Sequence, residues 1–161
     1  MKTNFSSVFM FYNLLATLSM AATIWGEAEG EPWKGKLAVG WVIKNRVTAN
    51  RSYFGKGYVG VVLKRKQFSC FNKTLKLLRK GKLKHDRVAN MLTTLDTKMS
   101  NCLAAAEATY HGIEKDPTNG AMWFVNKRLK GKMRWMRKLE HTVDIGNHSF
   151  YREEKDAKSK G

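Results

Sequence analysis

The chain has 161 residues, 43% of them hydrophobic, with only two prolines and thirteen glycines. This length and composition predict one compact globular domain and exclude a disordered protein. The formal net charge of +17 implies a polyanionic partner or surface, such as nucleic acid, teichoic acid, lipopolysaccharide phosphate or the carboxylates of peptidoglycan stem peptides.

The N-terminal segment carries no charge between Lys2 and Glu27. The apolar stretch Phe5–Met20, followed by small residues, is typical of a signal peptide or a weak membrane anchor. Polar side chains interrupt it, however, and its apolar residues recur at helical spacing. We therefore expect a core helix from Asn13 to Trp25 and keep export by a signal or anchor segment as the alternative. The expected buried face consists of Leu14, Leu15, Leu18, Ala22 and Trp25.

The next segments predict a turn and a second helix. Gly26 and Gly30 are expected to end the first helix, and Pro32 forces a real turn after Glu31. A largely buried second helix follows from about Trp33 to Thr48, and residues 50–60 form a glycine-punctuated loop.

The second half predicts one long helix and two strands. Apolar residues keep a period of 3.6 over Asp86–Tyr110, where Gly112 is the natural stop. After a turn at residues 116–120, short strands are expected at Ala121–Val125 and Leu139–Ile145. Residues 1–152 then form a single domain, and residues 153–161 a solvated tail.

Two segments concentrate the positive charge, namely Lys64–Lys84 and Lys127–Lys138. Interleaved aromatic residues (Phe68, Phe71 and Trp135) suggest nucleic-acid binding, but no recognisable nucleic-acid-binding motif accompanies them. The simpler interpretation is a cationic face that binds anionic envelope polymers, without a specific nucleic acid.

Cysteine and histidine are too sparse for a metal centre. Cys70 and Cys102 give no metal-ligand spacing, and the four histidines are scattered. A single disulfide stays possible, but two small buried side chains explain the cysteines better. We expect neither metal nor other cofactor.

Several motifs together resemble the SleB/CwlJ-type cell-wall hydrolases, which cleave peptidoglycan in spore cortex and in phage lysis. The resemblance covers about residues 14–151 in the family's order, and it implies a lysozyme-like, mostly helical α+β fold with a small β element flanking a cleft. The motifs are WGEAEGEP at Trp25–Pro32, GxxAVxxVIxNRV at Gly35–Val47, Gln67–Ser69, Asp116–Phe124 and Ile145–Tyr151.

Glu27 is the expected catalytic residue. A carboxyl desolvated at the end of an apolar helix has a raised pKa and can serve as a general acid near neutrality. The resemblance implies a lytic transglycosylase, in which one carboxyl protonates the leaving oxygen and then deprotonates the muramoyl 6-hydroxyl. Ordinary glycosidases use two carboxylates, so a hydrolytic outcome stays open.

The resemblance also assigns substrate-binding or supporting roles. Glu31 matches the family's second acidic position and is interpreted as structural or supporting, whereas Glu29 is interpreted as a solvated charge. Trp25 and Trp123 are interpreted as core residues rather than sugar platforms. The other supporting residues are Gln67, Ser69, Thr118, Asn119, His148 and Tyr151.

Together these features predict a peptidoglycan-degrading enzyme that cleaves the β-1,4 bond between N-acetylmuramic acid and N-acetylglucosamine. Compact size and high charge favour a monomeric phage endolysin of a Gram-negative host, made in the host cytoplasm and acting on the wall after release. The alternative is a non-catalytic protein of the same fold that binds the envelope or nucleic acid.

Overall fold

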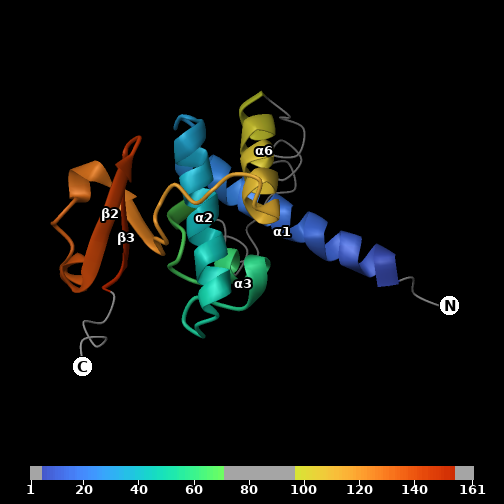
Figure 1. Ribbon diagram of the computed structural model, residues 1–161, viewed down its shortest axis with the longest axis horizontal. Helices are drawn as coiled ribbons and strands as arrows, with labels where there is room; N and C mark the ends of the chain where they lie inside the picture. The colour runs from blue at the N-terminus through green and yellow to red at the C-terminus, as the bar shows by residue number, and fades with distance from the viewer. Residues whose placement is uncertain (1–4, 71–96, 155–161) are drawn as a thin grey trace, which may run out of the picture.

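The computed structural model describes residues 5–70 and 97–154, which form a helical body with a small sheet on one side (Figure 1). The expected α+β class with mostly helical content is confirmed. The elements in chain order are α1 (Phe5–Ala28), α2 (Trp33–Ala49), α3 (Gly57–Leu63), α6 (Thr97–His111), β1 (Trp123–Asn126), η1 (Lys127–Leu129), η2 (Arg134–Lys138), β2 (Leu139–Ile145) and β3 (His148–Glu153).

Helix α2 separates two apolar cores. On one side it packs with α1, α3 and α6, and on the other side it packs on the sheet, as the arrangement in Figure 1 shows. The sheet-side core is formed by Ala38, Val42, Ala121, Ile145 and Phe150. Because α2 serves both cores, its buried residues occur nearly all round the helix and give it little amphipathic character.

The sheet is antiparallel with the strand order β1-β3-β2. In the register, Phe150 of β3 lies between Phe124 of β1 and Val143 of β2. The expected strand Leu139–Ile145 is confirmed, and the first strand lies at Trp123–Asn126, slightly later than expected. Strand β3 was missed, although the two residues before it, Gly-Asn, are a common hairpin turn.

The expected buried face of α1 is wrong. Leu14, Leu15 and Leu18 are 52%, 39% and 47% exposed. The helix also runs from Phe5 to Ala28, longer than the expected span. The buried side chains are Ala16, Thr17, Met20, Ala21, Thr23, Ile24 and Ala28, and the threonine hydroxyls donate to carbonyls of the preceding turn.

Two further boundaries differ from expectation. Residues 57–63, expected within or beside a glycine-rich loop, form α3 because Val61 and Val62 are buried in the core. Helix α6 begins at Thr97 in the described part of the chain and ends where Gly112 adopts a φ of 69°. The expected helical residues 86–96 lie outside the described residues.

The first helix and the last strand test what the sequence predicted for the two terminal segments. The N-terminal half of α1 projects away from the body on the side opposite the sheet (Figure 1). Within residues 5–70 and 97–154, no helix combines the length and apolarity needed to cross a membrane. At the other end, β3 includes Glu153, which forms an ion pair with Arg51, so the sheet extends one residue into the expected tail.

Candidate active site

Glu27 lies in the last turn of α1, not beyond the end of the helix. Gly26 does not stop the helix, which continues to Ala28. A Cβ atom at Gly26 would lie 2.5 Å from Cβ of Cys70. The absence of a side chain therefore lets the Ser69–Cys70 segment lie directly against the turn that carries Glu27.

The described residues hold one oxygen of the Glu27 carboxyl and leave the other without a hydrogen bond. Oε1 accepts hydrogen bonds from the Ser69 hydroxyl and the Cys70 backbone amide, both at 2.9 Å. Within the described residues no hydrogen bond reaches Oε2, and the side chain is half-buried, less enclosed than expected. A carboxyl that is oriented through one oxygen can exchange a proton with a ligand through the other.

Glu31 is a buried carboxyl whose two oxygens are both occupied. Its side chain is 7% exposed, Oε2 accepts from the Asn147 backbone amide, and Oε1 accepts from Asn147 Nδ2, each at 2.9 Å. A Cβ at Gly146, which has a φ of 55°, would overlap Glu31 Oε2. The Lys36 ammonium donates to the Glu31 carbonyl. This arrangement ties the loop between α1 and α2 to the β2–β3 hairpin, which fits a supporting role.

His148 lies beside Glu31 and feels the charge of Glu27. Nδ1 is 4.0 Å from Glu31 Oε1 and is buried without a hydrogen bond to the described residues, and the ring meets Phe124 edge-on at 5.1 Å. Burial lowers the pKa of His148 by more than the negative charges of Glu31 and Glu27 raise it. The imidazole is therefore neutral near neutral pH, without the charge that would draw it into an ion pair.

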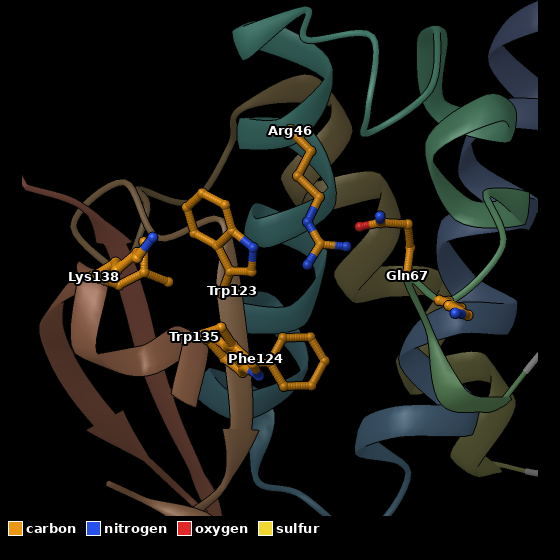
Figure 2. Close-up of a pocket in the computed structure, with 8 residues that line it drawn as sticks. Arg46, Gln67, Trp123, Phe124, Trp135 and Lys138 are labelled. Carbon is orange, nitrogen blue, oxygen red and sulfur yellow. The ribbon is translucent and has the colours of Figure 1, made fainter. Parts of the chain in front are cut away.

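A cleft of about 490 Å³ opens between α2, the segment after α3, β1 and η2. Figure 2 shows Trp123, Trp135 and Phe124 on the sheet side and Gln67 on the opposite side. Glu27 does not line this cleft. The Gln67–Ser69 segment connects the two, since Gln67 lines the cleft and Ser69 donates a hydrogen bond to Glu27. The lining residues are Arg46, Lys66, Gln67, Trp123, Phe124, Trp135, Lys138 and Leu139.

Arg46 is the site residue that sequence reasoning missed. It is 3% exposed, Nε donates to the Met122 carbonyl at 2.7 Å, and the guanidinium carbon lies 4.8 Å from the ring centre of Phe68. Burial lowers its pKa to about 10, against the opposing effect of the Glu27 charge, so it stays a cation. The available signal was the place of Arg46 in the GxxAVxxVIxNRV motif, directly after Lys44 and Asn45.

Other predicted residues lie away from the cleft lining. Thr118 is buried, and its amide and hydroxyl both donate to Asp116, which also accepts from the Asn45 side chain. Asn119 is exposed with a φ of 57°, and its carbonyl accepts from Arg152. These contacts indicate that residues 116–120 form a turn organised by Asp116, a residue the sequence analysis had not singled out.

Gln67 and Tyr151 have different surroundings. Gln67 lines the cleft, and its Nε2 donates to the Tyr53 carbonyl at 3.4 Å. Tyr151 is buried in β3 and packs edge-on against Trp135, a lining residue, and against His141. Tyr151 therefore supports the aromatic wall of the cleft rather than forming it.

The two basic segments contribute directly to the cleft. Lys66 of the first and Lys138 of the second are lining residues, while residues 71–84 of the first segment lie outside the described residues. Of the cysteines, Cys102 is buried and Cys70 is half-buried. In the ranges 5–70 and 97–154, no group of three His, Cys, Asp or Glu side chains is arranged to hold a metal ion.

Comparison with known proteins gives one family and two structural neighbours. The family model for cell wall hydrolases matches residues 30–151, a range that begins after Glu27. The catalytic domain of the germination-specific lytic transglycosylase SleB from Bacillus anthracis is 25% identical, with a TM-score of 0.59, and the match covers 85% of this chain and 93% of that chain. The catalytic domain of Bacillus cereus SleB is 26% identical, with a TM-score of 0.56, over 85% of this chain and 89% of that one. Among curated protein sequences, no match was found.

Proposed function

The chain belongs to the cell wall hydrolase family, as its motifs predicted, and from this premise we propose that it is a lytic transglycosylase of peptidoglycan. The bond cleaved is the β-1,4 linkage between N-acetylmuramic acid and N-acetylglucosamine, and Glu27 acts as the single acid and base. The observation that carries the proposal is the Glu27 carboxyl, which two donors hold at Oε1, which accepts no hydrogen bond at Oε2 from the described residues, and which the Gln67–Ser69 segment connects to an aromatic cleft.

The proposed reaction uses the open oxygen twice. Glu27 Oε2 first gives its proton to the glycosidic oxygen, and the bond from that oxygen to muramoyl C1 breaks. The resulting carboxylate then takes the proton of the muramoyl 6-hydroxyl as O6 bonds to C1. Glu27 regains its proton, and the product is a 1,6-anhydro sugar formed without water.

The state of Glu31 supports a mechanism with one carboxyl. A glycosidase of the usual kind needs a second carboxylate as nucleophile or as the base for a water molecule. Both oxygens of Glu31 already accept hydrogen bonds from Asn147. Engaging Glu31 in the reaction would break a buried contact between the hairpin and the loop after α1, which is energetically costly.

Mass spectrometry of the soluble products tests the reaction directly. We expect muropeptides one water lighter than hydrolysed ones to be released from purified peptidoglycan. Hydrated reducing ends would contradict transglycosylation while leaving glycan cleavage intact. Binding to peptidoglycan without release of fragments would instead support the non-catalytic alternative.

We propose further that the enzyme is a monomeric phage endolysin that leaves the host cytoplasm only at lysis. The net charge of +17 supports attraction to the anionic envelope of a Gram-negative host. Permeabilised Gram-negative cells should lose turbidity on addition of the protein. Export of a reporter fused to residues 1–21, in the absence of any phage protein, would contradict this localisation and support the signal-segment alternative.

A further inference from the structure

We propose that the cleft contains a carboxylate-binding subsite formed by Arg46, Lys66 and Lys138. The inference rests on the proposed function and deepens it, because it names the group on the glycan that the cleft recognises. The ligand is a carboxylate carried by a muramoyl residue. The same chemistry is supplied by the lactyl group once the stem peptide has been removed, and by the stem peptide itself where it is retained.

The charges lining the cleft are of one sign. Three of the eight lining residues are cations and none is an acid. The described acids of the neighbouring sheet have cationic partners elsewhere, as Glu140 pairs with Arg152 and Asp144 with Lys130. A concave surface lined by one sign of charge and walled by apolar rings concentrates its field on an incoming ligand.

The aromatic residues on the sheet side of the cleft determine how a sugar chain can bind beside the lining cations. Trp123, Phe124 and Trp135 occupy the sheet side of the cleft, and Arg46 lies between Trp123 and Gln67 in Figure 2. Sugar faces pack on aromatic rings while their substituents point outward. A carboxylate on a packed muramoyl residue can therefore reach the cations without displacing the ring.

Arg46 keeps donor capacity at the base of the cleft. Its Nε is used by the Met122 carbonyl, whereas Nη1 is buried without a hydrogen bond to the described residues. Phe54 and Phe68 lie against the guanidinium, with ring centres 5.2 and 4.8 Å from its central carbon. A guanidinium held in this way presents a fixed positive charge to an anion.

Lys66 is held in an unfavourable backbone conformation beside the cleft. Its φ is 68°, in the left-handed region that lysine rarely adopts, within a turn closed by the hydrogen bond from Gln67 N to Lys64 O. Glycine would satisfy this turn with less strain. Strained backbone positions of this kind concentrate at functional sites, which supports a function for the Lys66 side chain.

Binding measurements on the Glu27→Gln full chain test the subsite without turnover. The probes are three soluble oligosaccharides of equal length, namely an uncharged N-acetylglucosamine chain, a peptidoglycan chain stripped of stems by an amidase, and the same chain with its stems. We expect at least one carboxylate-bearing chain to bind about tenfold more tightly than the uncharged chain at low salt. Preference for the stripped chain identifies the lactyl carboxylate, and preference for the stem-bearing chain identifies the peptide. Equal affinity for all three chains would overturn the proposal.

Two double variants distinguish binding at the subsite from non-specific attraction by the net positive charge. Lys66→Gly with Lys138→Gln removes two lining cations, and glycine leaves the turn at position 66 unstrained. Lys64→Gln with Lys132→Gln removes two exposed cations of the same basic segments that do not line the cleft. Both double variants are made in the Glu27→Gln background.

The expected result is that only the first pair abolishes the preference, bringing the carboxylate-bearing and uncharged chains to within about twofold of each other. Equal weakening by both pairs would overturn the proposal in favour of non-specific attraction. The proposed function is tested separately: it fails if the wild-type chain releases no fragments from peptidoglycan. The two outcomes are distinguishable because binding by the Glu27→Gln protein is measured without cleavage.

Discussion

Glu27 and Glu31 are four residues apart, yet the structure places them in opposite kinds of surroundings. Glu27 is half-buried on the last turn of α1, with one oxygen held by Ser69 and Cys70 and the other without a hydrogen bond from the described part of the chain. Glu31 is buried in the following loop, with both oxygens held by Asn147. One carboxyl is oriented and available, whereas the other is fully used in holding two parts of the fold together.

This difference shows that two glutamates of one motif can contribute very differently to the free energy of unfolding. Within WGEAEGEP, Glu27 and Glu31 look alike as sequence positions, but the number of hydrogen bonds that their carboxyl oxygens accept distinguishes them. A buried carboxyl with every oxygen satisfied stabilises the fold, and its removal leaves donors without partners. A carboxyl with a free oxygen contributes less to the fold and can act on a ligand. Substitutions at the two positions should therefore affect different measurements.

The largest expected effect comes from exchanging each glutamate for glutamine. Glu27→Gln should lower fragment release from peptidoglycan by at least about a hundredfold, because it removes the general acid, while the denaturation midpoint stays near that of the wild type. Glu31→Gln should instead cost about 1–3 kcal/mol of unfolding free energy, because its amide group turns a donor toward the donors of Asn147. Fragment release and urea denaturation measured on both variants check the comparison, and it fails if the two variants lose activity and stability alike.

Gly146→Ala tests how tightly the β2–β3 hairpin holds Glu31. A methyl group there overlaps Glu31 Oε2 and must also adopt a positive φ, so we expect a loss of about 2–4 kcal/mol in unfolding free energy. Gly131→Ala is the matched control, since Gly131 also has a positive φ but has open space around its Cβ position. Backbone strain alone should cost this control about 1 kcal/mol in the same denaturation experiment. Equal losses would mean that Glu31 is not tightly held.

The smallest of these effects is expected at Ser69. Ser69→Ala removes one of the two donors to Glu27 Oε1, while the Cys70 amide stays in place. A lost hydrogen bond of about 1 kcal/mol predicts about a fivefold lower kcat with little change in KM, since orientation of the acid is impaired and not binding. Ser100→Ala, an exposed position on α6, should leave both constants unchanged. A change confined to KM would assign Ser69 to substrate binding instead.

The sequence predicted elements well where one physical signal dominated. Helix α2, strand β2 and the stop at Gly112 followed from apolar runs and a left-handed glycine. The same reasoning failed for the packing of α1, because it assigned the leucines to the core, whereas the structure buries Thr17 and Thr23 and leaves the leucines exposed. Small residues occupy the contact with α6 instead, because Ala21 of α1 shares a core cluster with the buried alanines of α6, whereas the leucines lie at the surface.

The site was only partly accessible to sequence reasoning. The motifs singled out Glu27 and Ser69, which the structure brings into contact, and His148, whose pKa responds to the Glu27 charge. They did not distinguish Thr118, which stabilises a turn, from residues that line the cleft. Arg46 escaped notice because its surroundings come from outside α2: Phe54 of the following loop lies against it, and so do Phe68 and Met122 from later segments.

Gly26 has a consequence for engineering a more thermostable form of this protein. A glycine inside a helix is a standard target, because alanine there gains about 0.5–1 kcal/mol from backbone entropy. At this position the added methyl group would press on Cys70, whose amide orients Glu27. Helix optimisation guided by propensity alone would therefore displace the donor that aligns the acid, and position 26 should be left unchanged in any stabilised design.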